Sequence, residues 1–291
     1  MRTHGLRLLV LLGTAALLAT AAACAPQDDT GGTAASSPSA SGCSPASLTT
    51  HAPGKFTVGT DDPVYEPWFV DNKPDNGQGF ESAVAYAVAT KLGYAKDQVV
   101  WTRVTFNNAI APGAKPYDVD INEFSITDDR RKAVDFSSPY YDVTQAVIAL
   151  KSSKIAGAKS LADLKSAKLG AQVGTTSYRA ITEVVKPVAQ PAVFNTNDDA
   201  KTALQNGQID GLVVDLPTAF YMTSAEINDS LILGQLPQPS GAPEQFGLVL
   251  DKGSALTACV SRAVDGLRSD GTLDSLRKQW LAQVAGAPEL S

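Results

Sequence analysis

Strand-like and helix-like segments alternate along this chain from Lys55 onward. Short runs rich in β-branched residues, such as FTVGT and GLVVD, are typical of strands. The segment GFESAVAYAVATKLGY carries apolar residues on one helical face and ends at Gly93, which suits a C-cap. This alternation predicts an α/β fold in which helices flank mainly parallel sheets.

Two apolar runs, VIALK and FGLVLDK, bracket the middle of the chain. They predict two crossings between two lobes, and 291 residues are enough for two modest cores. The first lobe would contain residues 55–148 and 247–285, and the second would contain residues 149–246. Ligands of open α/β sheets bind beyond the carboxyl ends of the strands, so we expect a binding site in the cleft between the lobes.

The first 24 residues differ from the rest of the chain. Arg2 and Arg7 precede an apolar run over residues 8–18, and Cys24 follows three alanines. The run is too short to cross a bilayer, so the pattern predicts a secretory signal. The end of the segment resembles the lipobox of bacterial lipoproteins, in which the cysteine is lipidated and becomes the mature N-terminus. The alternative is a plain secreted protein with a free or paired Cys24.

Residues 25–54 consist mostly of Ser, Ala, Gly, Thr and Pro, which predicts a flexible tether. The net charge of the whole chain is −6, and loss of the signal removes two arginines, so the mature chain is still more acidic. An acidic chain without a basic run argues against a nucleic-acid partner. We expect a monomer.

The chain has three cysteines. If Cys24 is lipidated, Cys43 and Cys259 remain in an oxidising location, which favours a disulfide between them. Such a bond would join the end of the tether to a helix near the C-terminus. The alternative is that Cys259, which is in phase with neighbouring apolar positions, is a small core residue.

The segment INEFSITDDR, residues 121–130, passes from a predicted strand to a charged turn. Ser125, Thr127 and Arg130 lie at the end of this strand. Arginine grips a carboxylate through two parallel hydrogen bonds, and a hydroxyl can add a third. The segment therefore predicts a carboxylate site, with a solvated charged turn as the alternative.

Two later segments place polar residues where a strand passes into a helix. AQVGTTS puts Thr175 and Thr176 at a helix start, where free N–H groups favour an anion. GLVVDLP puts Asp215 at a strand end, where a carboxylate suits an ammonium group. Helix capping is the alternative for both. Together with Arg130, these residues predict a site for an α-amino acid.

Six segments, in this order, resemble the extracellular solute-binding proteins of polar amino acid ABC transporters, known as family 3. They are GTDDPVYEPW, GFESAVAYAVATKLGY, SITDDR followed by VDFSSPYY, SLADLKSAKLGAQVGTTS, GQIDGLVVD and DGTLDSLRKQWL. The resemblance covers residues 55–281. It implies a two-lobed periplasmic-binding-protein fold with two hinge crossings. It also implies a protein lipid-anchored on the outer face of the cytoplasmic membrane, which captures a polar L-amino acid by lobe closure and delivers it to an ABC permease.

The resemblance also implies roles for individual residues. Arg130 would bind the α-carboxylate, helped by Ser125 and by hydroxyls of the second lobe, and Asp215 would bind the ammonium group. An aromatic ring would stack on the ligand side chain, and three residues before Ser125 would line the pocket. The full implied set is Tyr65, Asn122, Glu123, Phe124, Ser125, Arg130, Thr175, Thr176 and Asp215.

Glu123 stands where relatives often carry a small or neutral residue, and Asp61, Asp62 and Glu66 add carboxylates near the pocket mouth. An unpaired buried carboxylate is costly, so a cationic ligand such as arginine, lysine or ornithine is favoured. Glu81 replaces the aspartate that is common after Gly-Phe, and we expect this change to be structural.

Two other functions are compatible with this fold class. Relatives of the fold include prephenate-type dehydratases and murein-cleaving enzymes. However, Glu123 is the only general acid in the predicted pocket, and His4 and His51 lie in the signal and the tether. Neither a Ser-His-Asp set nor a metal cluster can be assembled, so we expect no enzyme activity, metal or cofactor. An amino-acid sensor lipoprotein is the second alternative.

Overall fold

The computed structural model describes residues 42–238, 242–284 and 286–291. The predicted secretory signal and the Cys24 lipidation site lie outside these residues. So does the first part of the predicted tether. The second part, residues 42–54, packs against the first lobe: Leu48 contacts its core, and the backbone N–H of His51 donates to Asp118 Oδ1 at 2.6 Å. The tether prediction therefore extended too far along the chain, because this segment has tertiary partners despite its polar composition.

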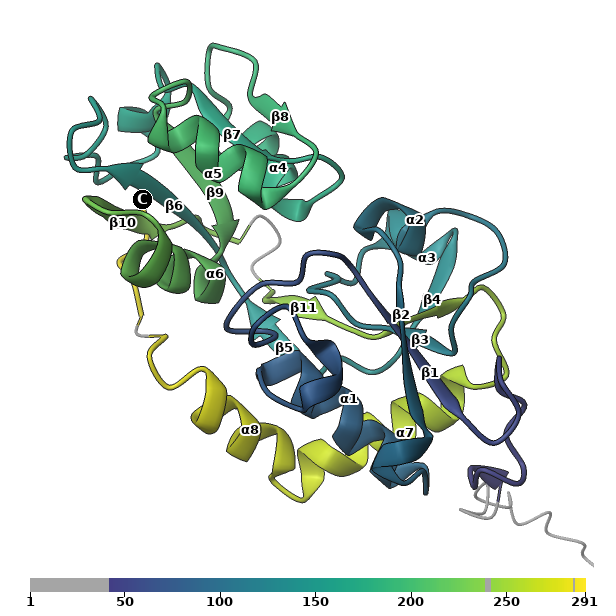
Figure 1. The fold of residues 1–291 in the computed structure, drawn as a ribbon. Helices are drawn as coiled ribbons and strands as arrows, with labels where there is room; N and C mark the ends of the chain where they lie inside the picture. Colours follow the sequence, from purple (N-terminus) through teal and green to yellow (C-terminus); the bar gives the residue numbers. More distant parts are fainter. Residues whose placement is uncertain (1–41, 239–241, 285) are drawn as a thin grey trace, which may run out of the picture. The chain divides into compact units, whose positions relative to one another are not determined.

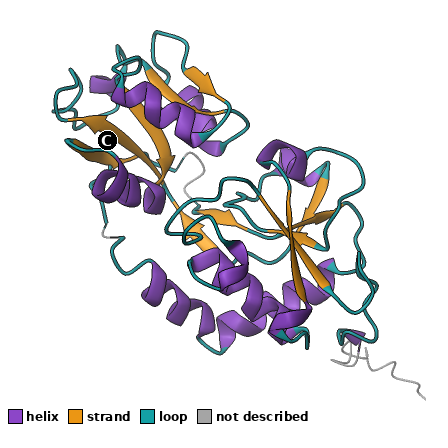
Figure 2. Cartoon of the chain, viewed as in Figure 1, coloured by secondary structure: helices purple, strands orange, loops and turns teal. Residues whose placement is uncertain are grey.

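The first lobe is built on a five-stranded sheet with the order β2-β1-β3-β12-β4 (Figure 1). Strand β1 pairs in parallel with β2 and β3, and only β12 runs against its neighbours. Helices flank the strands (Figure 2). The strands are β1 (Phe56–Thr60), β2 (Val99–Arg103), β3 (Val119–Asp120), β4 (Val134–Phe136) and β12 (Val249–Asp251). The helices are α1 (Phe80–Lys91), α2 (Phe106–Ile110), α3 (Asp128–Arg131), α7 (Thr257–Ser269) and α8 (Thr272–Trp280).

The second lobe has a sheet of the same size, with the order β10-β6-β9-β7-β8. Strand β7 pairs in parallel with β8 and β9, and β6 is antiparallel to both of its neighbours. The strands are β6 (Gln145–Leu150), β7 (Leu169–Gln172), β8 (Ala192–Phe194), β9 (Gly211–Asp215) and β10 (Ser230–Gln235). The α-helices are α4 (Thr176–Ala180), α5 (Asn197–Gln205) and α6 (Leu216–Tyr221), and α4 and α6 continue as π-turns over Ile181–Val185 and Met222–Glu226.

Each lobe encloses its own apolar core. In the first lobe, α7 buries Val260, Val264 and Leu267 against the side of the sheet that α1 also covers. In the second lobe, Leu169 and Val213 of neighbouring strands pack with Ile181 after α4. Short 3₁₀ turns complete the connections at Pro74–Asn76, Lys96–Gln98 and Ala162–Leu164. The predicted α/β fold with two lobes is confirmed, with one reversed strand in each sheet.

A two-stranded antiparallel ribbon of β5 (Tyr141–Val143) and β11 (Glu244–Phe246) joins the lobes. Strand β6 begins at Gln145 and already belongs to the second sheet, so the expected boundary at residue 148 falls inside a strand. The segment over residues 141–150 divides at Thr144, because the residues before it pair with β11 and those after it pair with β9 and β10.

The last residues of the chain form a third connection between the lobes. After α8, residues 286–291 reach β10, and the C-terminus lies beside the second sheet (Figure 1). The backbone N–H of Gln235 donates to Pro288 O at 2.7 Å, and that of Leu290 donates to Gln235 O at 2.9 Å. Leu290 is only 1% exposed in the second core. The predicted domains did not assign these residues, which we call the C-terminal strap.

Replacing Leu290 with alanine should lower the free energy of unfolding of the second lobe by about 2 kcal/mol, because a buried leucine side chain is lost from the core. Urea denaturation followed by circular dichroism measures this. Val188→Ala is the control, since Val188 is 90% exposed in the same lobe. A Leu290→Ala effect no larger than that of the control would mean that the strap contributes nothing to stability.

The structure joins Cys43 and Cys259 in a disulfide, with their Cα atoms 5.5 Å apart. Cys259 is also buried among the apolar residues of α7. It therefore has both the predicted disulfide partner and the core position that was the alternative. Among the described residues, no helix has both the length and the apolar character needed to cross a membrane.

Candidate functional site

A cavity lies where strand ends of the two lobes meet. The residues after β1 and β3 line it from the first lobe, and those at the ends of β7 and β9 line it from the second. This is the edge at which parallel strands of open α/β sheets place ligands. The lining residues are Asp61, Tyr65, Phe106, Asn122, Glu123, Arg130, Gln172, Thr175, Thr176, Ser177, Asn197, Val214 and Asp215.

Arg130 is buried at the centre of this site. It lies on α3, whose first turn is capped by Thr127: Thr127 Oγ1 accepts the Arg130 backbone N–H at 3.2 Å. Arg130 Nη1 donates to Ser125 O at 2.7 Å and Nη2 donates to Gly174 O at 2.9 Å, so the guanidinium contacts both lobes. Its carbon Cζ lies 5.3 Å from the ring centre of Phe106. Burial lowers the pKa of Arg130 to about 10, which leaves the group positively charged at neutral pH.

The two threonines at the start of α4 have different surroundings. Thr175 caps the helix: its Oγ1 accepts the Tyr178 N–H at 3.2 Å and donates to Gln172 O at 2.7 Å. Helix capping was the predicted alternative for this residue, and the Thr175 hydroxyl does cap the helix. The Thr176 hydroxyl instead lies 3.1 Å from that of Ser125, across the two lobes.

Asp215 ends β9 and precedes Pro217 in the first turn of α6. Its side chain makes no capping hydrogen bond to the described residues of the helix, so the capping alternative is wrong at this position. One carboxylate oxygen, Oδ1, accepts from Gln145 Nε2 at 2.6 Å. Burial, and then the negative charge of Glu244, raise the pKa of Asp215 well above that of an ordinary aspartate. A cation at this position would relieve that unfavourable charge.

Glu123 has a left-handed backbone, with φ of 53°, which is uncommon for a residue with a side chain. Its N–H donates to Glu81 Oε1 at 2.7 Å, and the Tyr140 hydroxyl donates to the same oxygen. Burial, followed by the charges of Glu81, Asp215 and Asp61, raises the pKa of Glu123 well above its usual value. Burial also raises the pKa of Glu81 to about 7. Glu81 is therefore a buried support for the backbone of Glu123.

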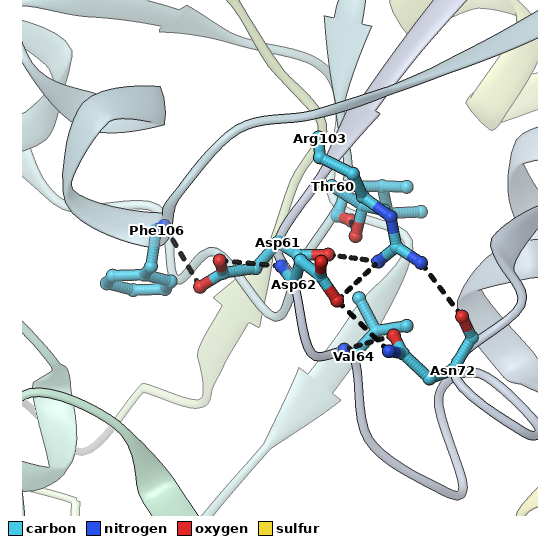
Figure 3. Close-up of polar contacts among 8 residues, drawn as sticks. Thr60, Asp61, Asp62, Val64, Asn72, Arg103 and Phe106 are labelled. Atoms are coloured by element: carbon cyan, nitrogen blue, oxygen red, sulfur yellow. Dashed lines mark hydrogen bonds and ion pairs between the residues drawn. The ribbon is translucent and has the colours of Figure 1, made fainter.

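The loop after β1 brings Asp61 to the cavity, and Figure 3 shows how it is held. Arg103 Nη2 donates to Asn72 O at 2.8 Å, and Nη1 contacts Asp61 O and, at 4.0 Å, Asp62 Oδ1. Asp61 Oδ2 accepts the Phe106 N–H at 3.1 Å. Three carboxylates were predicted near the pocket mouth, and of these only Asp61 lines the cavity. Asp62 pairs with Arg103 instead, and Glu66 is not among the lining residues.

Tyr65 lies further along the same loop and also lines the cavity. Burial raises the pKa of its hydroxyl, and the next contribution comes from Asp198 at the start of α5. A second contact between the lobes lies nearby, where Trp68 Nε1 donates to Thr218 Oγ1 at 2.8 Å. Tyr65 is therefore placed between the first lobe and a helix start of the second.

Two predicted binding residues do not line the cavity. Phe124 is fully buried in the first lobe, where its ring stacks on Phe106 at 4.8 Å between centroids, and Phe106 takes the lining position. Glu123, with its left-handed backbone, lies beyond the end of β3, and the side chain of Phe124 after it packs in the core. Ser125 is the second of these residues, and its hydroxyl donates to Glu244 Oε1.

Sequence reasoning missed Gln145 and Glu244. Gln145 Nε2 donates to Asp215 at 2.6 Å and to Glu244 Oε2 at 3.2 Å, and Gln145 Oε1 accepts from Ser177 Oγ at 2.6 Å. These two residues lie in the two crossings, at the first residue of β6 and the first residue of β11. A polar residue beside each predicted crossing is the only signal that the sequence offers.

The charges around the cavity are unequal. Among the described lining residues there are three carboxylates, on Asp61, Glu123 and Asp215, and one cationic side chain, on Arg130. Within the described ranges, no group of three or more His, Cys, Asp or Glu side chains could hold a metal ion. The described lining residues thus carry one cationic side chain and an excess of carboxylates.

Comparison with known proteins gives consistent matches. Residues 56–283 match the family of bacterial extracellular solute-binding proteins, family 3. The chain is 30% identical over 218 residues to the ABC transporter glutamine-binding protein GlnH of Bacillus subtilis. This match covers 72% of this chain and 76% of that protein. It is 29% identical over 212 residues to ABC transporter arginine-binding protein 1 of Escherichia coli, covering 70% and 82%.

A solved structure with a similar fold is the arginine-, lysine-, histidine-binding protein ArtJ from Geobacillus stearothermophilus. The TM-score is 0.66 at 25% sequence identity, and the match covers 79% of this chain and 96% of that chain. All three of these proteins are named for the amino acids that they bind.

Proposed function

The chain belongs to the bacterial extracellular solute-binding proteins of family 3, and from this premise we propose that it captures a basic L-amino acid between its lobes and delivers it to an ABC permease. The observation that carries the proposal is the charge of the cavity, where three carboxylates and one arginine converge among the described residues.

The α-carboxylate of the ligand pairs with Arg130 in this proposal. The guanidinium has five N–H donors, and two of its nitrogens already donate to the carbonyl oxygens of Ser125 and Gly174. These bonds fix the plane of the group while other donors remain for a carboxylate. The hydroxyl of Thr176 and the backbone N–H groups at the start of α4 add donors from the second lobe.

The ligand ammonium pairs with Asp215. Its carboxylate is held in position by Gln145 and has a raised pKa because of burial and the neighbouring Glu244. Arg130 belongs to the first lobe and Asp215 to the second, so neither lobe holds a zwitterion on its own. Closure of the lobes around the ligand follows from this division.

The ligand side chain is cationic in this proposal. Once Arg130 and Asp215 have paired with the amino-acid head group, Glu123 and Asp61 remain with raised pKa values caused mainly by burial. A guanidinium or ammonium group would supply the missing positive charge. The names of the arginine-binding relative and of the arginine-, lysine-, histidine-binding structure support this choice.

Delivery to a permease and lipid anchoring through Cys24 complete the proposal, with the protein acting as a monomer on the outer face of the cytoplasmic membrane. Both follow from family membership and from the predicted N-terminal segment. A role as a sensor for a signalling partner would use the same binding step, and transport assays in cells with and without the partner permease would separate the two.

Isothermal titration calorimetry with L-arginine and L-citrulline tests the choice of ligand. Citrulline has the same length as arginine but carries no side-chain charge. We expect the wild-type protein to bind arginine more tightly, and Glu123→Gln to reduce the arginine-to-citrulline preference by about tenfold, because one charge-assisted contact is lost.

The control is Asp71→Asn, which removes a carboxylate from an exposed turn of the first lobe where Asn also tolerates the positive φ of 60°. Its preference should match that of the wild type. Equal binding of arginine and citrulline by the wild-type protein would exclude the basic ligand, and absence of binding to any amino acid would exclude the function itself.

A further inference from the structure

The hydroxyl groups of Ser125 and Thr176 form a directed hydrogen-bond chain that ends on the hinge ribbon. Ser125 Oγ donates to Glu244 Oε1, and the two hydroxyl oxygens are 3.1 Å apart. Each hydroxyl has one proton to donate. Because the Ser125 proton goes to Glu244, the Thr176 proton goes to Ser125. Both protons are therefore used, and neither hydroxyl can donate to a ligand carboxylate at the same time.

Besides Ser125, Gln145 holds Glu244 in this position. Gln145 Nε2 donates to both carboxylate oxygens, at 3.2 Å to Oε2 and 3.4 Å to Oε1. The same amide lies 3.5 Å from Thr176 Oγ1. The charge of Glu244 also opposes the lowering of the Arg130 pKa that burial causes. The carboxylate of Glu244 thus engages the groups that would bind the carboxylate of an amino acid.

We propose that Glu244 is an internal competitor for the ligand carboxylate, and that it must release Ser125, which in turn frees Thr176, when an amino acid binds. This inference rests on the proposed function and adds a residue that sets its affinity. Ser125 does not line the cavity in the described structure, which agrees with a hydroxyl that turns to Glu244. Glu244 lies on β11 of the ribbon that joins the lobes, so its release is coupled to the hinge.

Glu244→Gln tests the proposal because glutamine keeps the size and the acceptor oxygen but is a weaker acceptor and carries no charge. We expect this variant to bind L-arginine at least about tenfold more tightly than the wild type, since a charge-assisted bond no longer opposes the ligand. Agmatine, which is arginine without its carboxylate, should gain clearly less, because it benefits only from the lower pKa of Asp215 once the charge of Glu244 is removed. Glu183→Gln is the matched control: it removes a carboxylate from the adjacent cavity that Glu244 also lines, where Glu183 pairs with Arg179 at 3.1 Å.

A second arm uses acetate, the simplest carboxylate, and does not depend on which amino acid binds. Acetate at constant ionic strength should raise the melting temperature of Glu244→Gln more than that of the wild type, and the added Arg130→Ala substitution should abolish the difference. Unchanged or weaker arginine binding, or an equal gain for agmatine, would overturn the proposal, as would the same acetate response in both proteins. If acetate stabilises the variant more than the wild type but no amino acid binds either protein, the proposed function fails, and what stands is that Glu244 competes with a carboxylate at Arg130.

Discussion

Arg130→Ala should lower the affinity for the amino acid by about 10² to 10⁴, because two charge-assisted hydrogen bonds of about 1.5–3 kcal/mol each are removed. Arg130 is buried, so water does not replace the lost hydrogen bonds well. Calorimetric titration of the wild type and the variant with the preferred ligand measures the effect. We expect this large effect because the guanidinium of Arg130 lies between the lobes, where it donates to a carbonyl oxygen of each.

Arg131→Ala is the control for this experiment. Arg131 is the next residue, belongs to the same helix and is exposed, with its guanidinium over the ring of Phe136 at 5.7 Å. Its removal should leave binding unchanged. Arg130→Lys keeps the charge but loses the planar fork, so it should fall between the wild type and alanine. If Arg130→Ala melts like the wild type and still binds with unchanged affinity, the assignment of the carboxylate site is wrong.

The strand ends were the most predictable part of the site. Parallel strands place their carboxyl ends at one edge of a sheet, so polar residues after FTVGT, DVDI, LGAQ and GLVVD could be expected to face a common cleft. Arg130 and Asp215 follow this rule and line one cavity. The rule depends on local pattern alone, which is why a sequence reveals it.

Contacts between distant segments were not predictable in the same way. Gln145 and Glu244 are 99 residues apart, and only the pairing of β5 with β11 brings them together. The left-handed backbone of Glu123 is equally hidden, because residues other than glycine rarely adopt it and no sequence pattern marks it. Phe124 after it is buried, while Glu123 lines the cavity.

The C-terminal strap shows a third kind of limit. Leu290 is the last apolar residue of a short polar segment, and one leucine defines neither a helical nor a strand period. Its burial depends on the edge of β10, where the backbone of Gln235 is paired by the returning chain. The predicted lobes therefore lacked their third connection.

Asp215→Asn should weaken binding by about 10- to 100-fold at neutral pH, because asparagine keeps the size and the acceptor for Gln145 but loses the charge that pairs with the ligand ammonium. Asp229→Asn is the control, since Asp229 is an exposed residue of the same lobe with a side chain 89% exposed. Equal affinities of Asp215→Asn and the wild type would show that the ammonium group binds elsewhere.

The pH dependence of the wild type gives an independent test of the same residue. Burial and Glu244 raise the pKa of Asp215, so its carboxylate becomes protonated at a higher pH than an ordinary aspartate does. Ammonium binding favours the ionised form, which means that affinity falls as the pH decreases through this raised pKa and that binding releases a proton there. Calorimetry in buffers of different ionisation enthalpy detects this proton. Asp215→Asn should release fewer protons and lose less affinity on acidification, and the protonation that remains then comes from Glu123 and Asp61, whose pKa values burial also raises. An identical pH profile in wild type and variant would remove Asp215 from the binding step, because the only group that differs between the two proteins is this carboxylate.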